Sequence, residues 1–216
     1  MSEKEIYRHS DESLKILYRV MGAEFQNLAV GLRFDELNAP KTKETVSEVY
    51  RRINVDVKRE YRKIARKAYR DTEKEIGAEH ADLTPFALVA GILSRADPVT
   101  EYIYTYEWLR KRDRLVESLM AVRNRQELRE ALKRALDLMA NQVRQYADNI
   151  TDEARMAAFE IAGVKKVRWN TQRDGRVCPE CHAREGLVYR INAVPDKHHR
   201  CRCYLTVASI SEEEEG

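Results

Sequence analysis

The sequence predicts an α+β protein, in which a mainly α-helical N-terminal region precedes a small β-containing C-terminal module. Apolar residues recur every three or four positions through residues 1–162, which is the periodicity of helices with one buried face. Beyond that stretch apolar and polar residues alternate, as they do in half-buried strands, and all four cysteines lie there. We therefore expect a helical region over residues 1–162, a module over residues 163–210 and an acidic tail over residues 211–216.

Capping and breaking residues divide the helical region into several expected helices. Ser10 and Asp11 can cap a first helix, which is interrupted over residues 38–40. Its recurring apolar positions are Leu14, Leu17, Tyr18, Met21, Phe25 and Leu28. A long second helix is expected over residues 42–76. Further helices are expected from Thr84, from Thr100 to Val122, over residues 126–146, and from Thr151 to Gly163. Apolar stripes beside charged faces favour a helical bundle or a set of hairpins.

The module is expected to contain three short strands. They are the segments over residues 164–169, 187–191 and 202–207, which alternate or are rich in β-branched and aromatic residues. The pair Asp174-Gly175 predicts a turn ahead of the first cysteine. A unit this small buries little apolar surface, so we expect a bound metal to complete its core.

The composition and the absence of several motifs narrow the class of protein. Of the 216 residues, 43% are hydrophobic and 35% are charged, which is not the profile of a disordered chain. No apolar run approaches the roughly 18 residues of a membrane span, and residues 1–13 lack the apolar core of a signal peptide. We therefore expect no membrane partner and a reducing cytoplasm. The sequence has no Gly-rich phosphate loop, His-Glu-x-x-His motif or nucleophile elbow, and we expect no enzymatic activity.

The cysteines form two close pairs, Cys178/Cys181 and Cys201/Cys203, about twenty residues apart. A Cys-x-x-Cys turn presents two sulfurs to one metal, and residues i and i+2 of a strand share one face. His198 precedes Cys201 by three positions and is a fifth candidate ligand, so both a Cys₄ and a Cys₃His site are compatible with the spacing. Either set fills the four positions of tetrahedral Zn²⁺, which predicts a structural zinc rather than a catalytic one.

Other interpretations of the cysteines stay open at this point. Disulfides form in oxidising compartments, and incidental free thiols seldom occur as two pairs. A redox Cys-x-x-Cys usually accompanies a βαβ pattern, which is missing here, and it leaves the second pair unexplained. The run Cys178-Pro-Glu-Cys181-His182 also fits the attachment pattern of c-type haem, which requires export. The zinc site is the interpretation that uses both pairs.

The long second helix carries a dense basic stretch. Its basic residues are Arg51, Arg52, Lys58, Arg59, Arg62, Lys63, Arg66, Lys67 and Arg70, against only Asp56 and Glu60. Such a helix can lie along a phosphate backbone or an acidic protein face. The alternative is a solvated helix face supported by ion pairs within the helix. The formal net charge of +3 does not decide between them.

The module also resembles a known family. Its matching residues are Gly163, Val167, Trp169, Thr171, Asp174, Val177, Cys178, Cys181, Gly186, Pro195, His198, Cys201, Arg202 and Cys203. With this pattern the module is similar to the C-terminal module of the phage Mu protein F-like family of minor head proteins. The resemblance covers about fifty of the 216 residues. Two departures concern the surroundings of His198: His199 stands where the family has proline, and two residues separate Pro195 from His198.

The resemblance implies a head-morphogenesis protein of a tailed phage or prophage. Such a protein associates with portal and capsid proteins and assists DNA packaging or ejection, first in the host cytoplasm and then in the virion interior. DNA bound without sequence preference and a second copy of the chain are further partners to expect. In this scheme the zinc is structural, Trp169 packs beside it and Asp174 shapes the turn that leads into the site. An alternative function is that of a zinc-containing nucleic-acid-binding regulator that uses the basic helix.

Overall fold

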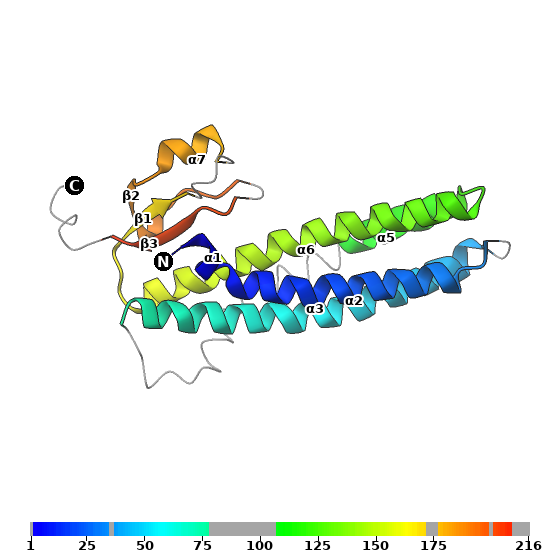
Figure 1. Ribbon diagram of the computed structural model, residues 1–216, viewed down its shortest axis with the longest axis horizontal. Coiled ribbons are helices and arrows are strands. Elements are labelled where there is room, and N and C mark those ends of the chain that lie inside the picture. Colours follow the sequence, from blue (N-terminus) through cyan, green and yellow to red (C-terminus); the bar gives the residue numbers. More distant parts are fainter. Residues whose placement is uncertain (1, 35–36, 78–106, 172–176, 199–200, 209–216) are drawn as a thin grey trace. The chain divides into compact units, whose positions relative to one another are not determined.

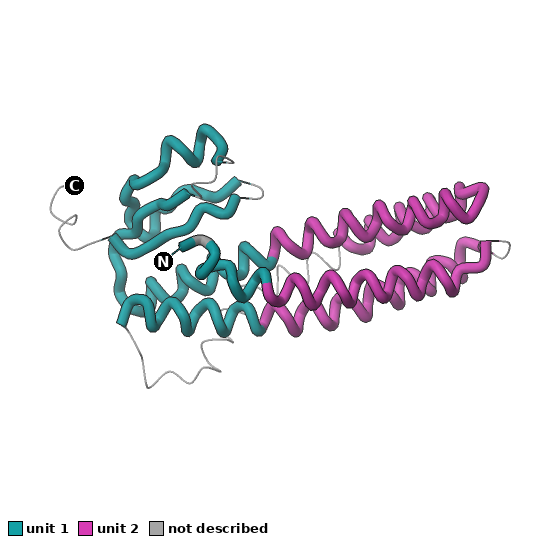
Figure 2. Tube along the Cα trace, in the orientation of Figure 1, with its two compact units in different colours: residues 1–11, 63–92, 147–216 teal, residues 12–62, 93–146 magenta. Residues whose placement is uncertain are grey.

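The computed structural model (Figure 1) divides into two compact units, which Figure 2 distinguishes by colour. The residues that it describes are 2–34, 37–77, 107–171, 177–198 and 201–208. The first unit combines Met1–Asp11, Lys63–Ile92 and Ala147–Gly216, and the second combines Glu12–Arg62 and Leu93–Tyr146. Each unit therefore contains segments that are far apart in the sequence.

Helices dominate the chain, as the sequence predicts. The helices of the described residues are α1 (Glu3–Ile6), α2 (Arg8–Gly31), α3 (Ala39–Glu75), α5 (Leu109–Met120), α6 (Arg125–Ile161) and α7 (Pro179–Arg184). The bounds of α2 and α3 agree with the first two expected helices. The helix expected from Thr84 lies outside the described residues, and α5 is the described part of the helix expected from Thr100. None of the described helices is long and apolar enough to cross a membrane.

The second unit is a helical bundle held by buried apolar stripes (Figure 2). Tyr50 of α3 contacts Trp108 edge-on, with 6.0 Å between the ring centroids. The Tyr61 hydroxyl donates a hydrogen bond to the carbonyl oxygen of Val143 at 2.9 Å. Tyr18, expected on the stripe of α2, is instead 39% exposed. It follows Leu17 directly, and a step of about 100° around the helix moves it off the buried face.

Helix α6 corrects the expectation of two helices divided near Thr151. It runs without a break from Arg125 to Ile161. The Thr151 hydroxyl does not cap a new helix; it donates a hydrogen bond to the carbonyl oxygen of Ala147, at 3.1 Å and one turn earlier. The expected end is confirmed, since Gly163 adopts a φ of 73° and its N–H donates to the carbonyl oxygen of Glu160.

The first unit contains a three-stranded antiparallel sheet in the order β2-β1-β3 (Figure 1). Its strands are β1 (Lys166–Asn170), β2 (Val188–Arg190) and β3 (Tyr204–Val207), and a short 3₁₀ turn, η3 (Ile191–Ala193), follows β2. Trp169 of β1 lies opposite Leu205 of β3, and Val167 lies opposite Tyr189 of β2. The alternation predicted for these segments therefore places Trp169 and Val167 on one face of the sheet.

The core of the first unit is built partly from the cysteines. Its buried members are Phe159, Val167, Trp169, Cys181, Cys201, Cys203 and Leu205. They come from α6, β1, α7, and the segment that leads into and forms β3, and Tyr189 of β2 packs against them partly buried. The predicted α+β arrangement is thus confirmed, and three cysteines are part of the buried core beside the small sheet.

Candidate metal centre

The first cysteine pair is arranged by the beginning of α7. Cys178 has extended backbone angles, with φ −70° and ψ 157°, and stands at the N-cap of the helix. Its Sγ accepts the N–H of Cys181 at 3.3 Å, and Pro179 follows at the first helical position, where its missing N–H costs nothing. A helix capped in this way brings the two thiols to the same side of the turn. The short helix α7 itself was not expected from the sequence.

The second pair enters the site through a turn that includes His198. The N–H of Cys201 donates to the carbonyl oxygen of His198 at 3.1 Å, and β3 begins directly after Cys203. This turn returns the chain from η3 to the edge of β1. It therefore places a histidine and two cysteines close to the first pair.

The five candidate ligands come together in two overlapping triads. Cys178, Cys181 and His198 form one triad, and Cys181, Cys201 and Cys203 form the other, with the ligand atoms of each within 4.8 Å of one another. The His198 Nε2 lies 3.1 Å from the Sγ of both Cys178 and Cys181. The Sγ atoms of Cys181 and Cys201 are 3.5 Å apart. Cys181, which belongs to both triads, is the centre of the cluster.

These separations are close to those of the donors of a tetrahedral metal. With metal–sulfur bonds of about 2.3 Å and metal–nitrogen bonds of about 2.0 Å, neighbouring donors lie roughly 3.5 to 3.8 Å apart. The 3.5 Å between the Cys181 and Cys201 sulfurs falls in this range, and the 3.1 Å from His198 Nε2 to the Cys178 and Cys181 sulfurs is shorter, so a bound ion would have to move the imidazole slightly away from them. The soft thiolates and imidazole are the ligands that Zn²⁺ prefers. The residues present therefore fit a bound metal ion.

Hydrogen bonds and burial shift the pKa values of the thiols in opposite directions. The Cys181 N–H, and then the nearby His198, lower the pKa of Cys178. Burial raises the pKa of Cys181 to about 12. A hydrogen bond from the Cys203 thiol lowers the pKa of Cys201 to about 5, and the same bond raises the pKa of Cys203. Without a cation the cluster thus keeps some of its protons, and metal binding must release them.

The residues that the resemblance adds to the site are buried beside it. Trp169 is fully buried in the same core as three of the cysteines, and the guanidinium of Arg184 lies 5.1 Å from the centroid of its ring. Thr171 is also buried, and its N–H donates to the carboxylate of Glu185 at 2.5 Å. Asp174, expected to shape the turn before Cys178, lies outside the described residues.

The basic stretch of α3 divides into paired and exposed groups. Arg51 pairs with Glu48 at 2.7 Å, Arg52 with Glu24 at 2.7 Å, and Arg59 with Asp56 at 2.5 Å. The exposed basic residues closer to the end of the helix are Arg62, Lys63, Arg66, Lys67 and Arg70, while Lys58 is half-buried. Two of these pairs, Arg51 with Glu48 and Arg59 with Asp56, lie within α3, whereas Arg52 pairs with Glu24 of α2.

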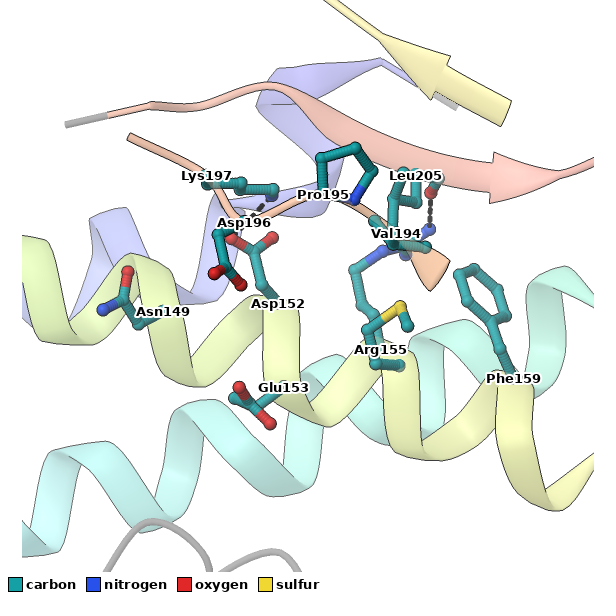
Figure 3. Close-up of a pocket in the computed structure, with 11 residues that line it drawn as sticks. Asn149, Asp152, Glu153, Arg155, Phe159, Val194, Pro195, Asp196, Lys197 and Leu205 are labelled. Carbon is teal, nitrogen blue, oxygen red and sulfur yellow. Dashed lines mark hydrogen bonds and ion pairs between the residues drawn. The ribbon is translucent and has the colours of Figure 1, made fainter. Parts of the chain in front are cut away.

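A pocket of about 520 Å³ lies in the first unit beside the metal cluster (Figure 3). One wall is α6, from Asn149 to Phe159, and the other is the segment from Val194 to Lys197, which leads directly into His198. Lys197 pairs there with Asp152 at 2.7 Å. The sequence offered no means of joining these two residues, because they lie in different predicted elements. Their pairing is nevertheless what fixes the segment before His198 against the helix.

Comparisons with known proteins identify no relative of the chain. No protein-family model, curated protein or solved structure matches the chain.

Proposed function

We propose that the chain is a minor head protein of a tailed phage or prophage, which docks on portal or capsid proteins and assists DNA packaging or ejection. One observation carries the proposal. The residues on which the resemblance to the Mu protein F-like module depends are far apart in sequence, yet Trp169, Cys181, Cys201 and Cys203 share one buried core. His198 of the same motif contacts Cys178 and Cys181. Residues of one motif that lie together in the folded chain support a shared structural role, here that of holding the module together.

Zinc is the metal that we propose for the cluster, with Cys178, Cys181, His198 and Cys201 as its ligands. Three of these side chains are already mutual neighbours, and the Sγ of Cys201 lies 3.5 Å from that of Cys181. Cys203 then packs in the core, since it is 5% exposed. Four protein ligands leave no position for a reactive water, so the ion joins α7 to β3 and performs no chemistry.

A second candidate function is that of a zinc-containing nucleic-acid-binding regulator. The exposed basic residues of α3 favour it, because Arg66 and Arg70 lie one helical turn apart on one side of the helix, where both can contact a phosphate backbone. A head protein that contacts packaged DNA would use the same basic surface of α3, but it would bind all DNA sequences alike. The two candidates therefore differ in whether one DNA sequence competes better than another.

The test combines metal content with partner binding. Protein purified reduced and without chelators should contain about one zinc per chain, and it should co-purify with the portal protein of the same phage or prophage when the two are expressed together. A variant with Cys178→Ser and Cys181→Ser should lose both the zinc and the portal. A matched variant, Glu117→Gln on the exposed face of α5, should lose neither. Zinc-loaded protein that binds one DNA sequence strongly and ignores the portal would instead identify the regulator.

A further inference from the structure

Two aspartates of α6 each receive a cation from the chain segment that carries the metal ligands. Lys197 Nζ lies 2.7 Å from Asp152 Oδ2 (Figure 3). The Arg202 guanidinium donates two hydrogen bonds to the carboxylate of Asp148, each 3.0 Å long. Asp148 and Asp152 are one helical turn apart and therefore lie on the same face of α6.

The two cations, Lys197 and Arg202, are neighbours in sequence of the proposed metal ligands. Lys197 directly precedes His198, and Arg202 lies between Cys201 and Cys203. Each side chain that reaches α6 is thus a direct sequence neighbour of a proposed ligand. Fixing Lys197 and Arg202 fixes the backbone on both sides of the turn that presents the histidine and the second cysteine pair.

Tyr7 of the N-terminal segment lies between the two ion pairs. Its ring is fully buried, with Arg202 4.8 Å and Lys197 5.9 Å from its centroid. Its hydroxyl lies 2.8 Å from Asp152 Oδ1 and 3.2 Å from the carbonyl oxygen of Cys203, and it accepts a hydrogen bond from Lys197 at 3.2 Å. One phenol therefore contacts both cations, one carboxylate and the backbone of the metal cluster.

These ion pairs contribute more to the position of the ligand segment than to the stability of the fold. The side chains of Asp148, Arg202, Asp152 and Lys197 are between 9% and 19% exposed. Desolvation offsets much of the attraction between such partly buried charges, so the net free energy of each pair is small. The directional hydrogen bonds remain, and they restrict the segment that carries the ligands before any metal arrives. Less conformational entropy is then lost when the metal binds.

We propose that Tyr7, Asp148 and Asp152 are positioning residues for the metal, which raise its affinity by holding the ligand segment in its binding conformation. The inference rests on the proposed metal site. Because linkage is reciprocal, an occupied site also strengthens the docking of the N-terminal segment. Metal affinity and the order of residues 2–11 are consequently coupled, although none of these residues is a ligand.

Zinc affinity of the full chain, measured by competition with a chromophoric chelator, tests the proposal. Tyr7→Phe removes only the hydroxyl, and Asp152→Asn and Asp148→Asn preserve shape while removing charge. Each should weaken zinc binding about 10- to 100-fold, the range typical of groups that orient ligands from behind. The tetrahedral absorption spectrum of the Co²⁺-substituted protein should be unchanged, because all the ligands are retained.

The control is Glu153→Gln, which neutralises the carboxylate next to Asp152 on the exposed side of α6. Its zinc affinity should equal that of the wild type. The proposal is overturned if the Tyr7→Phe and Asp152→Asn variants bind zinc as tightly as the wild type. It is also overturned if Glu153→Gln weakens zinc binding as much as these two substitutions do. Should Asp152→Asn fail to fold, Tyr7→Phe and Lys197→Gln decide the question in the same assay.

Hydrogen exchange of residues 2–11 supplies the reciprocal measurement. Removing zinc from the wild type should speed exchange in this segment, and the Tyr7→Phe variant should show a smaller difference between its loaded and stripped forms. Equal exchange with and without zinc in the wild type would contradict the coupling. A wild-type protein that binds no zinc at all would refute the metal site itself, which is a separate outcome from that of the positioning residues.

Discussion

Arg155 of α6 donates a hydrogen bond to the main-chain carbonyl oxygen of Leu205 at 3.0 Å, which joins the helix to the last strand of the sheet. The same guanidinium donates to the hydroxyl of Thr72 at 3.2 Å and pairs with Glu75 at 2.9 Å. It also lies 5.3 Å from the centroid of the Phe159 ring. Since its side chain is only 5% exposed, a single buried cation links α3, α6 and β3 in the first unit.

Replacing this cation should destabilise the first unit strongly. Arg155→Leu leaves the Glu75 carboxylate and the Leu205 carbonyl without their partner, and removing one member of a buried pair costs about 3 to 5 kcal/mol. Urea unfolding, followed by a spectroscopic probe of the first unit, measures this free energy of unfolding. Arg144→Leu is the matched control, because Arg144 is an exposed arginine of the same helix and should change the free energy by less than about 0.5 kcal/mol. Equal effects of the two substitutions would argue against the role of Arg155.

Removing the metal should unfold the module and spare most of the helices. In a Trp108→Phe background Trp169 is the remaining tryptophan, and it is buried beside the cysteines. Adding a strong chelator should therefore change the tryptophan fluorescence, because the free energy of metal binding is part of the folding free energy of so small a sheet. Far-UV circular dichroism should retain most of the helical signal. Parallel loss of both signals at one chelator concentration would contradict the prediction.

Glu48 predicts an acid-sensitive contact on α3. The hydrogen bonds from Arg51, with a further contribution from Arg52, lower the pKa of Glu48 to about 2 from its ordinary value of 4.5. A carboxyl whose pKa is lower in the folded state stabilises it above pH 4.5, and this contribution is lost as the pH falls from 4.5 toward 2. The effect on stability should be small because the pair is exposed. Two-dimensional NMR should show the Glu48 carboxyl titrating well below its ordinary pKa of 4.5, and a midpoint near 4.5 would refute the contact.

The exposed basic groups of α3 should account for any binding to DNA. Changing Arg66, Lys67 and Arg70 to Gln removes up to three phosphate contacts, and each contact contributes about 0.9 to the slope of log K against log salt. The slope should therefore fall by roughly 2 to 3 in fluorescence anisotropy with a labelled duplex. A control triple variant, Arg51→Gln, Arg52→Gln and Arg59→Gln, changes residues that already pair with carboxylates and should alter the slope less. A larger fall in the slope for the control variant than for the Arg66, Lys67 and Arg70 variant would contradict the prediction.

Much of the fold could be predicted because its determinants are local. The periodicity of α2 and α3 and the alternation of the three strands depend on residues close in sequence, and so does the glycine that ends α6. The failure at Thr151 is also local: a threonine can cap a helix or donate to the preceding turn, and its residue type does not decide which. The cysteine pairs could be recognised because two thiols that lie two or three positions apart can bind the same metal ion.

What could not be predicted depends on contacts between distant segments. Nothing in the sequence joins Tyr7 to Asp152, or Arg202 to Asp148, because charged residues at these spacings occur throughout the chain. The position of His198 against Cys178 and Cys181 likewise follows from the return of the chain after β2, not from its distance to Cys201. Residue types limited the candidates, and only the tertiary arrangement selected among them.

The contact between Tyr7 and Cys203 joins groups 196 residues apart in the sequence. A ribosome releases the first of them long before the second has been translated, whereas every residue of the second unit has been translated once Tyr146 is made. Contacts of such separation form slowly, because a long loop must close before they contribute. During synthesis Tyr7 can make this contact only after Cys203 has been translated, so the second unit can begin to fold before the N-terminal segment and the metal cluster are joined.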